Sequence, residues 1–232
     1  QGNTMANDLN LFVLWANGRH KETEIINDIN RHFEILQSFE ITWTPKLFTR
    51  NLSRFYGKKL PSAVKKKRLC GTRSFLVICV NDTQPRIHNG KNLNIIAAKA
   101  RYRQIIGSNC IHAGDLQPEA EENLLFLTGL NWQDLLSSRQ QPIRRPIKLY
   151  QDLCGTPSWL DEEQFEQFLR KLPNIRFSRN ADEFKILTDD RHQTCRLLNA
   201  SKKIFSWHRD CYTIPIRGKN IKFRISESPQ TE

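Results

Sequence analysis

The run Ser74–Val80 (SFLVICV) constrains the fold most, because apolar, β-branched and aromatic residues follow one another there without polar alternation. Such a run is typical of the central strand of a sheet, where both faces are covered. The first half of the chain is therefore expected to fold around this strand.

Periodicity predicts the elements around it. Apolar residues at helical spacing indicate an amphipathic helix over 21–36, and alternation at Phe39, Ile41 and Trp43 indicates a strand with one covered face. In chain order, the first half is predicted to contain strands at 9–15, 39–43, 74–80 and 109–112 and helices at 21–36, 44–56, 94–106 and 118–127, the last two ended by Gly107 and Gly129. The second half is predicted to contain helices at 161–171 and 191–198, strands at 175–177 and 184–187, and a hairpin of 212–216 with 221–225.

This order of elements predicts an α+β protein whose N-terminal domain has a ferredoxin-like sheet with its helices on one face. The segment from Leu130 to Pro146 is polar, basic and contains prolines, which is typical of a linker. We therefore expect a ferredoxin-like domain over 7–130, a basic linker over 131–148 and a small α+β domain over 149–232.

Positive charge is concentrated in two segments. The chain has 36 Lys and Arg against 24 Asp and Glu, a formal net charge of +12. Segment 58–73 holds seven cations, segment 139–148 holds four, and neither holds an acid. This pattern favours an anionic partner such as a nucleotide or a nucleic acid, although two solvated connecting loops would carry the same charges.

Composition also excludes several classes of protein. No apolar run approaches the roughly 20 residues of a membrane-spanning helix, and residues 1–10 lack the layout of a signal peptide. The six cysteines are scattered without a CxxC pair, which is typical of buried free thiols. We expect a cytoplasmic protein without a membrane partner, and the sequence leaves its oligomeric state open.

A candidate phosphoryl-transfer motif lies at the strand predicted over 109–112. The run 109–115 (NCIHAGD) precedes a helix that begins with Pro118, Glu119, Ala120 and Glu121. This arrangement resembles the catalytic segment of nucleoside diphosphate kinases, in which an N-x-x-H-G-S-D run precedes a helix with an E-x-A-x-x-E pattern. The element order over 9–127 is similar to that family, and 99–107 resembles its helix that ends in an arginine and a glycine.

The resemblance implies that His112 accepts the γ-phosphoryl group of a nucleoside triphosphate, bound with Mg²⁺, and passes it to a second nucleotide. It also implies that Arg103 grips a phosphate, that Tyr56 lies beside the imidazole and that Asn109 helps to position the ring. Such chemistry requires a neutral imidazole with one ring nitrogen free. A histidine that is simply hydrogen-bonded at the end of a strand is the alternative interpretation.

The sequence departs from the family at its phosphate ligands. Trp15 replaces the lysine of the family's I-K-P-D run, Ser108 stands where the family has a long loop with Thr and Arg ligands, and Gly114 replaces the serine after the histidine. Because phosphoryl transfer depends on positioning and charge neutralisation, other cations must take over. The candidates are three consecutive lysines of segment 58–73: Lys65, Lys66 and Lys67.

A second resemblance is carried by residues 176–190 (RFSRNADEFKILTDD) and 221–225 (IKFRI). They are similar to a nucleotidyltransferase-type domain, in which a D-x-D pair and a third aspartate on a neighbouring strand hold two Mg²⁺ ions. Here Glu183, Lys185 and Arg224 stand at those positions, and a cation cannot bind Mg²⁺. The resemblance therefore implies a degenerate domain without this metal site; an unrelated small α+β module is the alternative.

Two further interpretations concern the same region. His192 and Cys195, and His208 and Cys211, form two H-x-x-C pairs whose spacing is compatible with a structural zinc, although a helix over 191–198 would direct its cysteine into the core. Strand alternation would also place two cations, Lys222 and Arg224, on one face that could follow phosphates, unless this is simply the wet face of a half-buried sheet.

The sequence thus favours a nucleotide-handling protein of transferase ancestry that transfers phosphate through His112. The alternative is a catalytically inactive protein that binds a nucleotide or a nucleic acid through its basic segments. The chemistry of His112 separates the two hypotheses.

Overall fold

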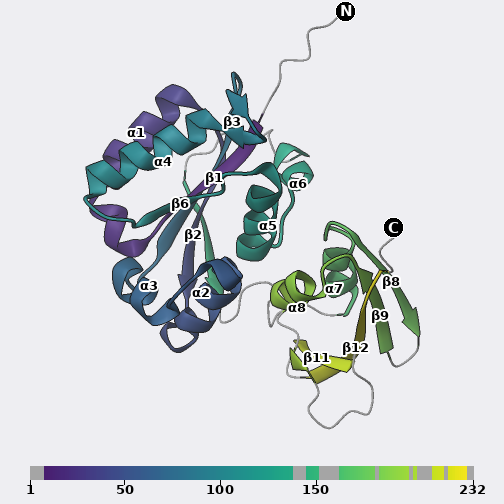
Figure 1. Cartoon of the computed structure of the whole chain (residues 1–232). Helices are drawn as coiled ribbons and strands as arrows, with labels where there is room; N and C mark the ends of the chain where they lie inside the picture. The colour runs from purple at the N-terminus through teal and green to yellow at the C-terminus, as the bar shows by residue number, and fades with distance from the viewer. Residues whose placement is uncertain are drawn as a thin grey trace, which may run out of the picture.

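The computed structural model describes residues 8–137, 145–151, 162–180, 183–198, 201–202, 211–216 and 219–228. Within these residues the chain forms two five-stranded sheets, a two-stranded hairpin and the helices that pack on the sheets (Figure 1). The expected α+β class is confirmed.

The central strand of the first sheet is β3 (Phe75–Asp82), in which all eight residues are buried. It pairs antiparallel with β1 (Asp8–Leu14) on one side and with β2 (Glu34–Trp43) on the other. Beyond them, β6 (Ile111–Ala113) pairs antiparallel with β1, and β7 (Ile147–Gln151) pairs parallel with β2. The strand order is therefore β6-β1-β3-β2-β7.

Six α-helices accompany this sheet in the described part of the chain: α1 (Glu22–His32), α2 (Phe48–Tyr56), α3 (Ala63–Cys70), α4 (Leu93–Ile106), α5 (Gln117–Thr128) and α6 (Trp132–Ser137). Short 3₁₀ turns lie at Ala16–Lys21, Pro45–Leu47 and Gly57–Lys59, and a small hairpin joins β4 (Ile87–His88) to β5 (Lys91–Asn92). As predicted, α4 and α5 end at glycines in the left-handed conformation, Gly107 and Gly129.

These helices lie on both faces of the sheet, so the expectation that they share one face is wrong. Phe12 of β1 contacts Tyr102 of α4 with ring centroids 5.5 Å apart, which places α4 on one face. Trp15 has the opposite parity and contacts Phe55 of α2 at 6.0 Å, so α2 lies on the other face. Phe126 of α5 contacts Phe55 at 5.7 Å and belongs to that second face.

The second sheet has the order β10-β11-β12-β9-β8. Its strands are β8 (Ile175–Asn180), β9 (Glu183–Thr188), β10 (Ser201–Lys202), β11 (Cys211–Ile216) and β12 (Lys219–Glu227), accompanied by α7 (Glu162–Leu169) and α8 (Arg191–Leu198). The predicted hairpin of β11 with β12 is confirmed, and β12 pairs parallel with β9. Phe165 of α7 packs against Phe184 and Phe223 with ring centroids 5.9 and 5.2 Å away, so α7 covers the apolar face of this sheet.

Three expected boundaries differ in the structure. The first helix ends at His32, because β2 begins at Glu34 in order to pair with β3. Segment 58–73, expected to be a connection, contains α3, whose N-terminus is capped by the Ser62 hydroxyl. Segment 131–148, expected to be a linker, contains α6 and the start of β7, so residues 147–151 extend the first sheet. No helix in the described ranges has the length and apolarity needed to cross a bilayer.

Candidate functional site

His112 lies on the edge strand β6, in a cage of aromatic rings. Its imidazole meets Phe55 and Tyr56 edge-on, with each ring centroid 5.2 Å away. The residue is partly exposed and borders a pocket of about 180 Å³. The ring sits on the face of the sheet that carries α2 and α5, because His112 pairs with Val13 of β1. The two aromatic rings thus hold the imidazole in place while one side of it borders the pocket.

The imidazole of His112 is hydrogen-bonded to the side-chain amide of Asn123 in α5, and the orientation of that amide determines the tautomer of the ring. Nδ2 of Asn123 lies 3.0 Å from Nε2 of His112. In this orientation the amide donates to Nε2, and the proton of the neutral ring is on Nδ1. Turning the amide by half a rotation would let its oxygen accept from Nε2–H and leave the Nδ1 lone pair free. Asn123 therefore decides which ring nitrogen can act as a nucleophile.

The imidazole is neutral at neutral pH. Burial, followed by the nearby charges of Lys99, Lys66 and Arg103, lowers the pKa of His112 to about 3. Asp115 opposes this shift but is itself engaged by the Lys99 ammonium, which also holds the pKa of that carboxyl below its usual range. A neutral ring among cations is suited to an anionic group.

Two predicted residues, Tyr56 and Arg103, reach this site and present buried polar atoms. In the described structure the Tyr56 hydroxyl and the Nε of Arg103 are both enclosed without a well-formed hydrogen bond, and the Trp15 indole lies beside the hydroxyl. Nη2 of Arg103 donates weakly to the Ile111 carbonyl at 3.5 Å. Burial raises the pKa of Tyr56, so it stays a neutral phenol. Unpaired buried donors call for a water or an anion, because leaving each unsatisfied costs about 1–3 kcal/mol.

Lys66 also reaches the site. Its ammonium lies 5.2 Å from the centre of the Tyr56 ring and donates to the Asn109 carbonyl at 3.2 Å. Burial lowers the pKa of this lysine, which marks a poorly solvated cation. The other predicted residues do not join the site: Lys65 is exposed, Lys67 donates to the Pro45 carbonyl at 3.4 Å, and Asn109 contributes its backbone oxygen to Lys66.

The pocket has an acidic rim that sequence reasoning missed. Glu119 and Glu122 of α5 line it, together with Lys59 and with Gln193 of α8. Oε1 of Glu119 pairs with Lys59 at 3.4 Å, and Oε2 of Glu122 accepts from Gln193 at 2.7 Å. One signal was present in the sequence, because Glu119 and Asn123 are four residues apart on a predicted helix and therefore share a face.

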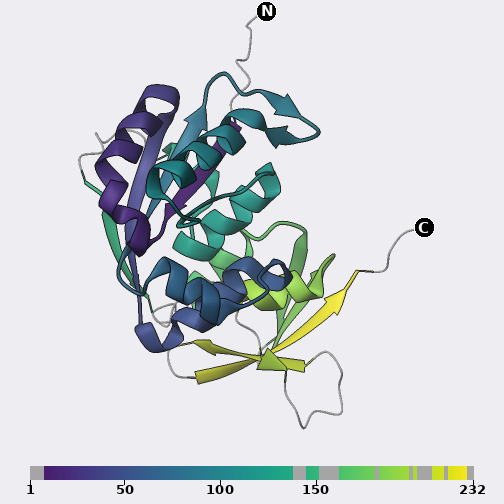
Figure 2. The same ribbon diagram turned by 60° about the vertical axis from the view of Figure 1, so that its left-hand side comes forward.

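Helix α8 of the second half closes the pocket, and no sequence signal indicated this. Arg196 of α8 donates to the carbonyls of Arg54 and Phe55 at 2.7 and 3.0 Å, and also pairs with Glu122. In return, Arg54 donates to the carbonyls of Arg196 and Leu197 at 3.1 and 3.2 Å. Each arginine satisfies the free carbonyls at the end of the other helix, which favours a positive charge there. Both views show α8 beside α2 (Figures 1 and 2).

The positions that resemble a nucleotidyltransferase triad also come together. Lys185 of β9 lies directly beside Arg224 of β12, and Nε of Arg224 pairs with Oε1 of Glu183 at 3.0 Å. This cluster holds one carboxylate and two cations, which is unsuited to Mg²⁺.

The residues of the zinc alternative are only partly described. His192 is exposed on α8, whereas Cys195 packs against the core, and burial raises the pKa of its thiol to about 11. His208 lies outside the described residues, and of Cys211 the backbone in β11 is described. Among the described side chains, no three His, Cys, Asp or Glu are grouped so as to hold a metal ion.

The structure has a weak likeness to solved proteins. No family model and no curated protein matches the chain. Among solved structures, a nucleoside diphosphate kinase of Aquifex aeolicus is similar, with 14% sequence identity and a TM-score of 0.37. The match covers 51% of this chain and 93% of that one.

Proposed function

We propose that this chain is a nucleotide-handling protein of transferase ancestry that accepts a phosphoryl group on His112. The observation that carries the proposal is a neutral imidazole beside a pocket, with the cations of Lys66 and Arg103 near enough to lower its pKa. The antiparallel strand order β6-β1-β3-β2 supports the ferredoxin-like interpretation of the N-terminal sheet.

In the proposed step, a ring nitrogen of His112 attacks the γ-phosphorus of a nucleoside triphosphate. A P–N bond forms, the bond from phosphorus to the bridging oxygen breaks, and the nucleoside diphosphate leaves with that electron pair. Attack by Nδ1 requires the amide of Asn123 to turn from its orientation in the structure, in which Nδ2 faces Nε2. The amide oxygen then accepts a hydrogen bond from Nε2–H, and the proton stays on Nε2. A second nucleoside diphosphate then takes the phosphoryl group, and the imidazole is restored.

Lys66 and Arg103 are proposed to stabilise the negative charge of the transferred group. Lys66 enters from α3, where its ammonium donates to the Asn109 carbonyl. We propose that it replaces the lysine that the family has at the end of the first strand, where this chain has the buried Trp15. The nucleotide would bring Mg²⁺ on its own phosphate oxygens, and that ion neutralises charge when bound. The pocket is smaller than the 300–1,000 Å³ of sites that enclose whole ligands, so it fits the phosphoryl group with the nucleoside outside.

Labelling with [γ-³²P]ATP or GTP and Mg²⁺ tests the proposal. The wild type should acquire an acid-labile, alkali-stable label, His112→Gln should acquire none, and the exposed His20→Gln should label normally. Asn123→Asp should label faster, because a carboxylate accepts from Nε2–H and leaves Nδ1 free. An unlabelled wild type, or equal labelling of His112→Gln, would rule out the phosphohistidine.

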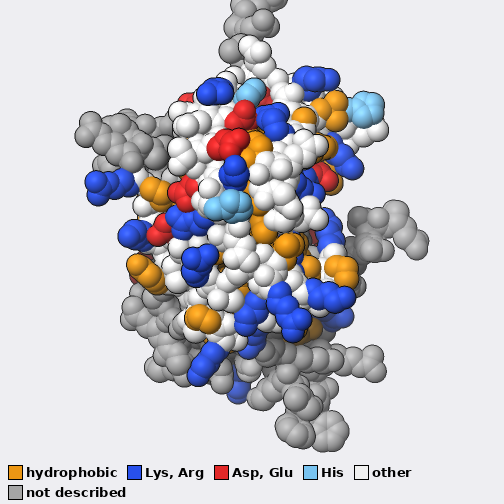
Figure 3. All heavy atoms as spheres, turned by 90° about the vertical axis from the view of Figure 1, so that its left-hand side faces the viewer, with side chains coloured by type: hydrophobic (Ala, Val, Ile, Leu, Met, Phe, Trp, Pro, Cys, Tyr) orange, Lys and Arg blue, Asp and Glu red, His pale blue; other side chains and the backbone are white. Residues whose placement is uncertain are grey.

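Binding of polynucleotide through α3 is the second candidate function. This helix carries four consecutive cations over 65–68, of which Lys65 and Arg68 are exposed. Lys and Arg side chains gather over the lower part of the face in Figure 3, where α3 lies. If α3 binds phosphates, Lys65→Gln with Arg68→Gln should weaken binding and flatten its salt dependence, without affecting labelling of His112.

A further inference from the structure

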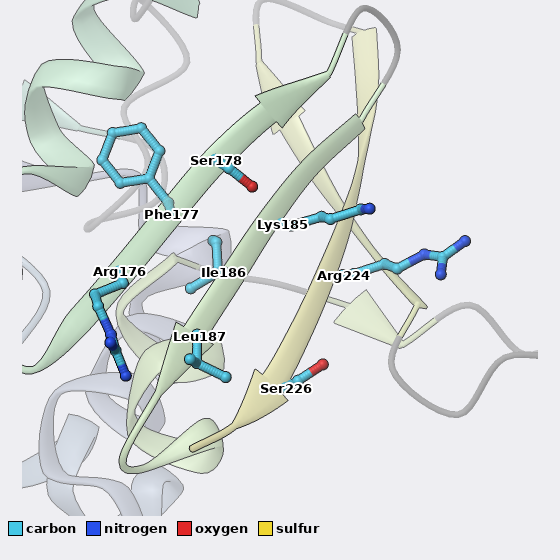
Figure 4. Close-up of a pocket in the computed structure, with 8 residues that line it drawn as sticks. All are labelled: Arg176, Phe177, Ser178, Lys185, Ile186, Leu187, Arg224 and Ser226. Carbon is cyan, nitrogen blue, oxygen red and sulfur yellow. The ribbon is translucent and has the colours of Figure 1, made fainter. Parts of the chain in front are cut away.

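The second sheet presents a polar face that no described helix covers. Strand alternation places three pairs of side chains on it: Arg176 and Ser178 of β8, Lys185 and Leu187 of β9, and Arg224 and Ser226 of β12 (Figure 4). The opposite face carries Phe184 and Phe223, which are buried against α7. We call this set of six residues the open face.

The open face is hollowed by about 480 Å³. Arg176, Ser178 and Lys185 are exposed, and Arg224 keeps 44% of its side chain accessible. A small ligand normally has most of its surface covered by its site, and a hollow on an uncovered sheet does not provide that cover. An extended ligand that crosses the three strands fits this shape better.

The charges of the open face are not balanced internally. Lys185 lies directly opposite Arg224 in the β9–β12 register, and like charges in that position destabilise a sheet. Glu183 offsets Arg224 through a 3.0 Å ion pair, whereas Lys185 and Arg176 have no ionic partner among the residues described. Lys222 adds a further exposed cation on the same side of β12. A bound anion would remove this repulsion.

We propose that the open face binds the phosphate backbone of a single-stranded nucleic acid. Guanidinium groups and serine hydroxyls are typical donors to phosphate oxygens, and Arg176, Arg224, Ser178 and Ser226 supply both kinds. Three adjacent strands span about 10 Å, which accommodates one polynucleotide chain. Phe177 also borders the hollow, but strand alternation directs it to the opposite face, where the Arg170 guanidinium lies 5.2 Å from the centre of its ring. The open face itself therefore offers no ring on which bases could stack, and binding is insensitive to sequence.

Anisotropy of a fluorescent 20-nucleotide oligothymidine, titrated with the full chain at several salt concentrations, tests this surface. For each phosphate of a single strand that a protein no longer neutralises, the slope of log K against log salt falls by about 0.7. Arg176→Gln with Lys185→Gln should therefore reduce the slope by about 1.4 and weaken binding roughly 25-fold at 0.1 M salt. Both side chains are exposed, so the double variant should keep the circular dichroism of the wild type.

The matched control is Arg86→Gln with Lys91→Gln, which removes the same charges from exposed positions beside the β4–β5 hairpin. It should bind like the wild type. Equal weakening in the control, or weakening only in the α3 variant, would show that the open face is not the site. Absence of binding at low salt, or equal affinity for duplex DNA of the same length, would also overturn the proposal. These readouts do not depend on phosphorylation of His112, so the two proposals fail separately.

Discussion

At the scale of the residue, His112 makes stability depend on pH. Its pKa is lowered to about 3 from an ordinary 6.5, so between these values the unfolded state binds a proton that the native state does not. The contribution of this ring to the free energy of unfolding is therefore fully present above pH 6.5 and is lost as the pH falls towards 3. At pH 4.5 the expected loss from this one group is about 3 kcal/mol.

Urea unfolding at pH 7.0 and pH 4.5 measures this loss. The drop in the free energy of unfolding should be smaller in His112→Gln than in the wild type by about 3 kcal/mol. His20→Gln, in which an exposed histidine is replaced, should retain the wild-type drop. An equal drop in His112→Gln and the wild type would show that the ring is protonated normally in the folded protein.

Part of the candidate site could be predicted from the sequence. Resemblance to a family motif indicated His112, Tyr56 and Arg103, and the structure brings these side chains together with Lys66. Lys65 and Lys67 could not be separated from Lys66, because only the orientation of α3 decides which of three consecutive lysines points inward. Arg196 could not be found at all, because its partners are more than 70 residues away in the sequence.

At the scale of the element, one side chain, Gln151, anchors the edge strand β7 to β2 and to α5. Oε1 of Gln151 accepts from the indole of the buried Trp43 at 3.1 Å, and its Nε2 donates to the Leu127 carbonyl at 2.9 Å. Gln151→Ala should reduce the free energy of unfolding by about 2 kcal/mol, because two buried polar groups lose partners. Gln37→Ala, which removes only a local bond to Ser38, should cost much less in the same denaturation experiment. Similar losses in both variants would contradict this role.

Three elements of the structure were predicted closely from the sequence. The central strand, the 94–106 helix and the 191–198 helix all lie within a residue or two of their predicted limits. α3 and β7 were missed, because the four cations of α3 and the proline-containing segment before β7 conceal short elements that owe their stability to tertiary contacts. The second face of helices was missed because periodicity does not say on which side of a sheet a helix packs.

At the scale of the whole molecule, the Arg54–Arg196 exchange predicts that the two halves unfold together. The two arginines make four hydrogen bonds to carbonyls across the α2–α8 contact, and Arg196 is also the partner of Glu122. Calorimetry of the wild type should show one transition. Arg196→Ala should separate it into two, because it removes the ionic partner of Glu122 and the donors to the last carbonyls of α2, at a cost of roughly 3 kcal/mol.

Arg170→Ala is the matched control, since Arg170 pairs with Glu166 inside the second half. It should leave a single transition. Two transitions already in the wild type would show that the helices touch without coupling the halves.

Gly57 lies where the end of α2 contacts Arg196 of α8, and it limits how this contact can change in evolution. It has φ +59°, and a Cβ at this position would lie 3.1 Å from Nη1 of Arg196. Any other residue here would strain the backbone and displace that guanidinium at once. Relatives that lack Arg196 are therefore expected to have lost Arg54 as well but to keep glycine at position 57, because its φ of 59° with ψ of −141° suits glycine alone whether or not the guanidinium is there.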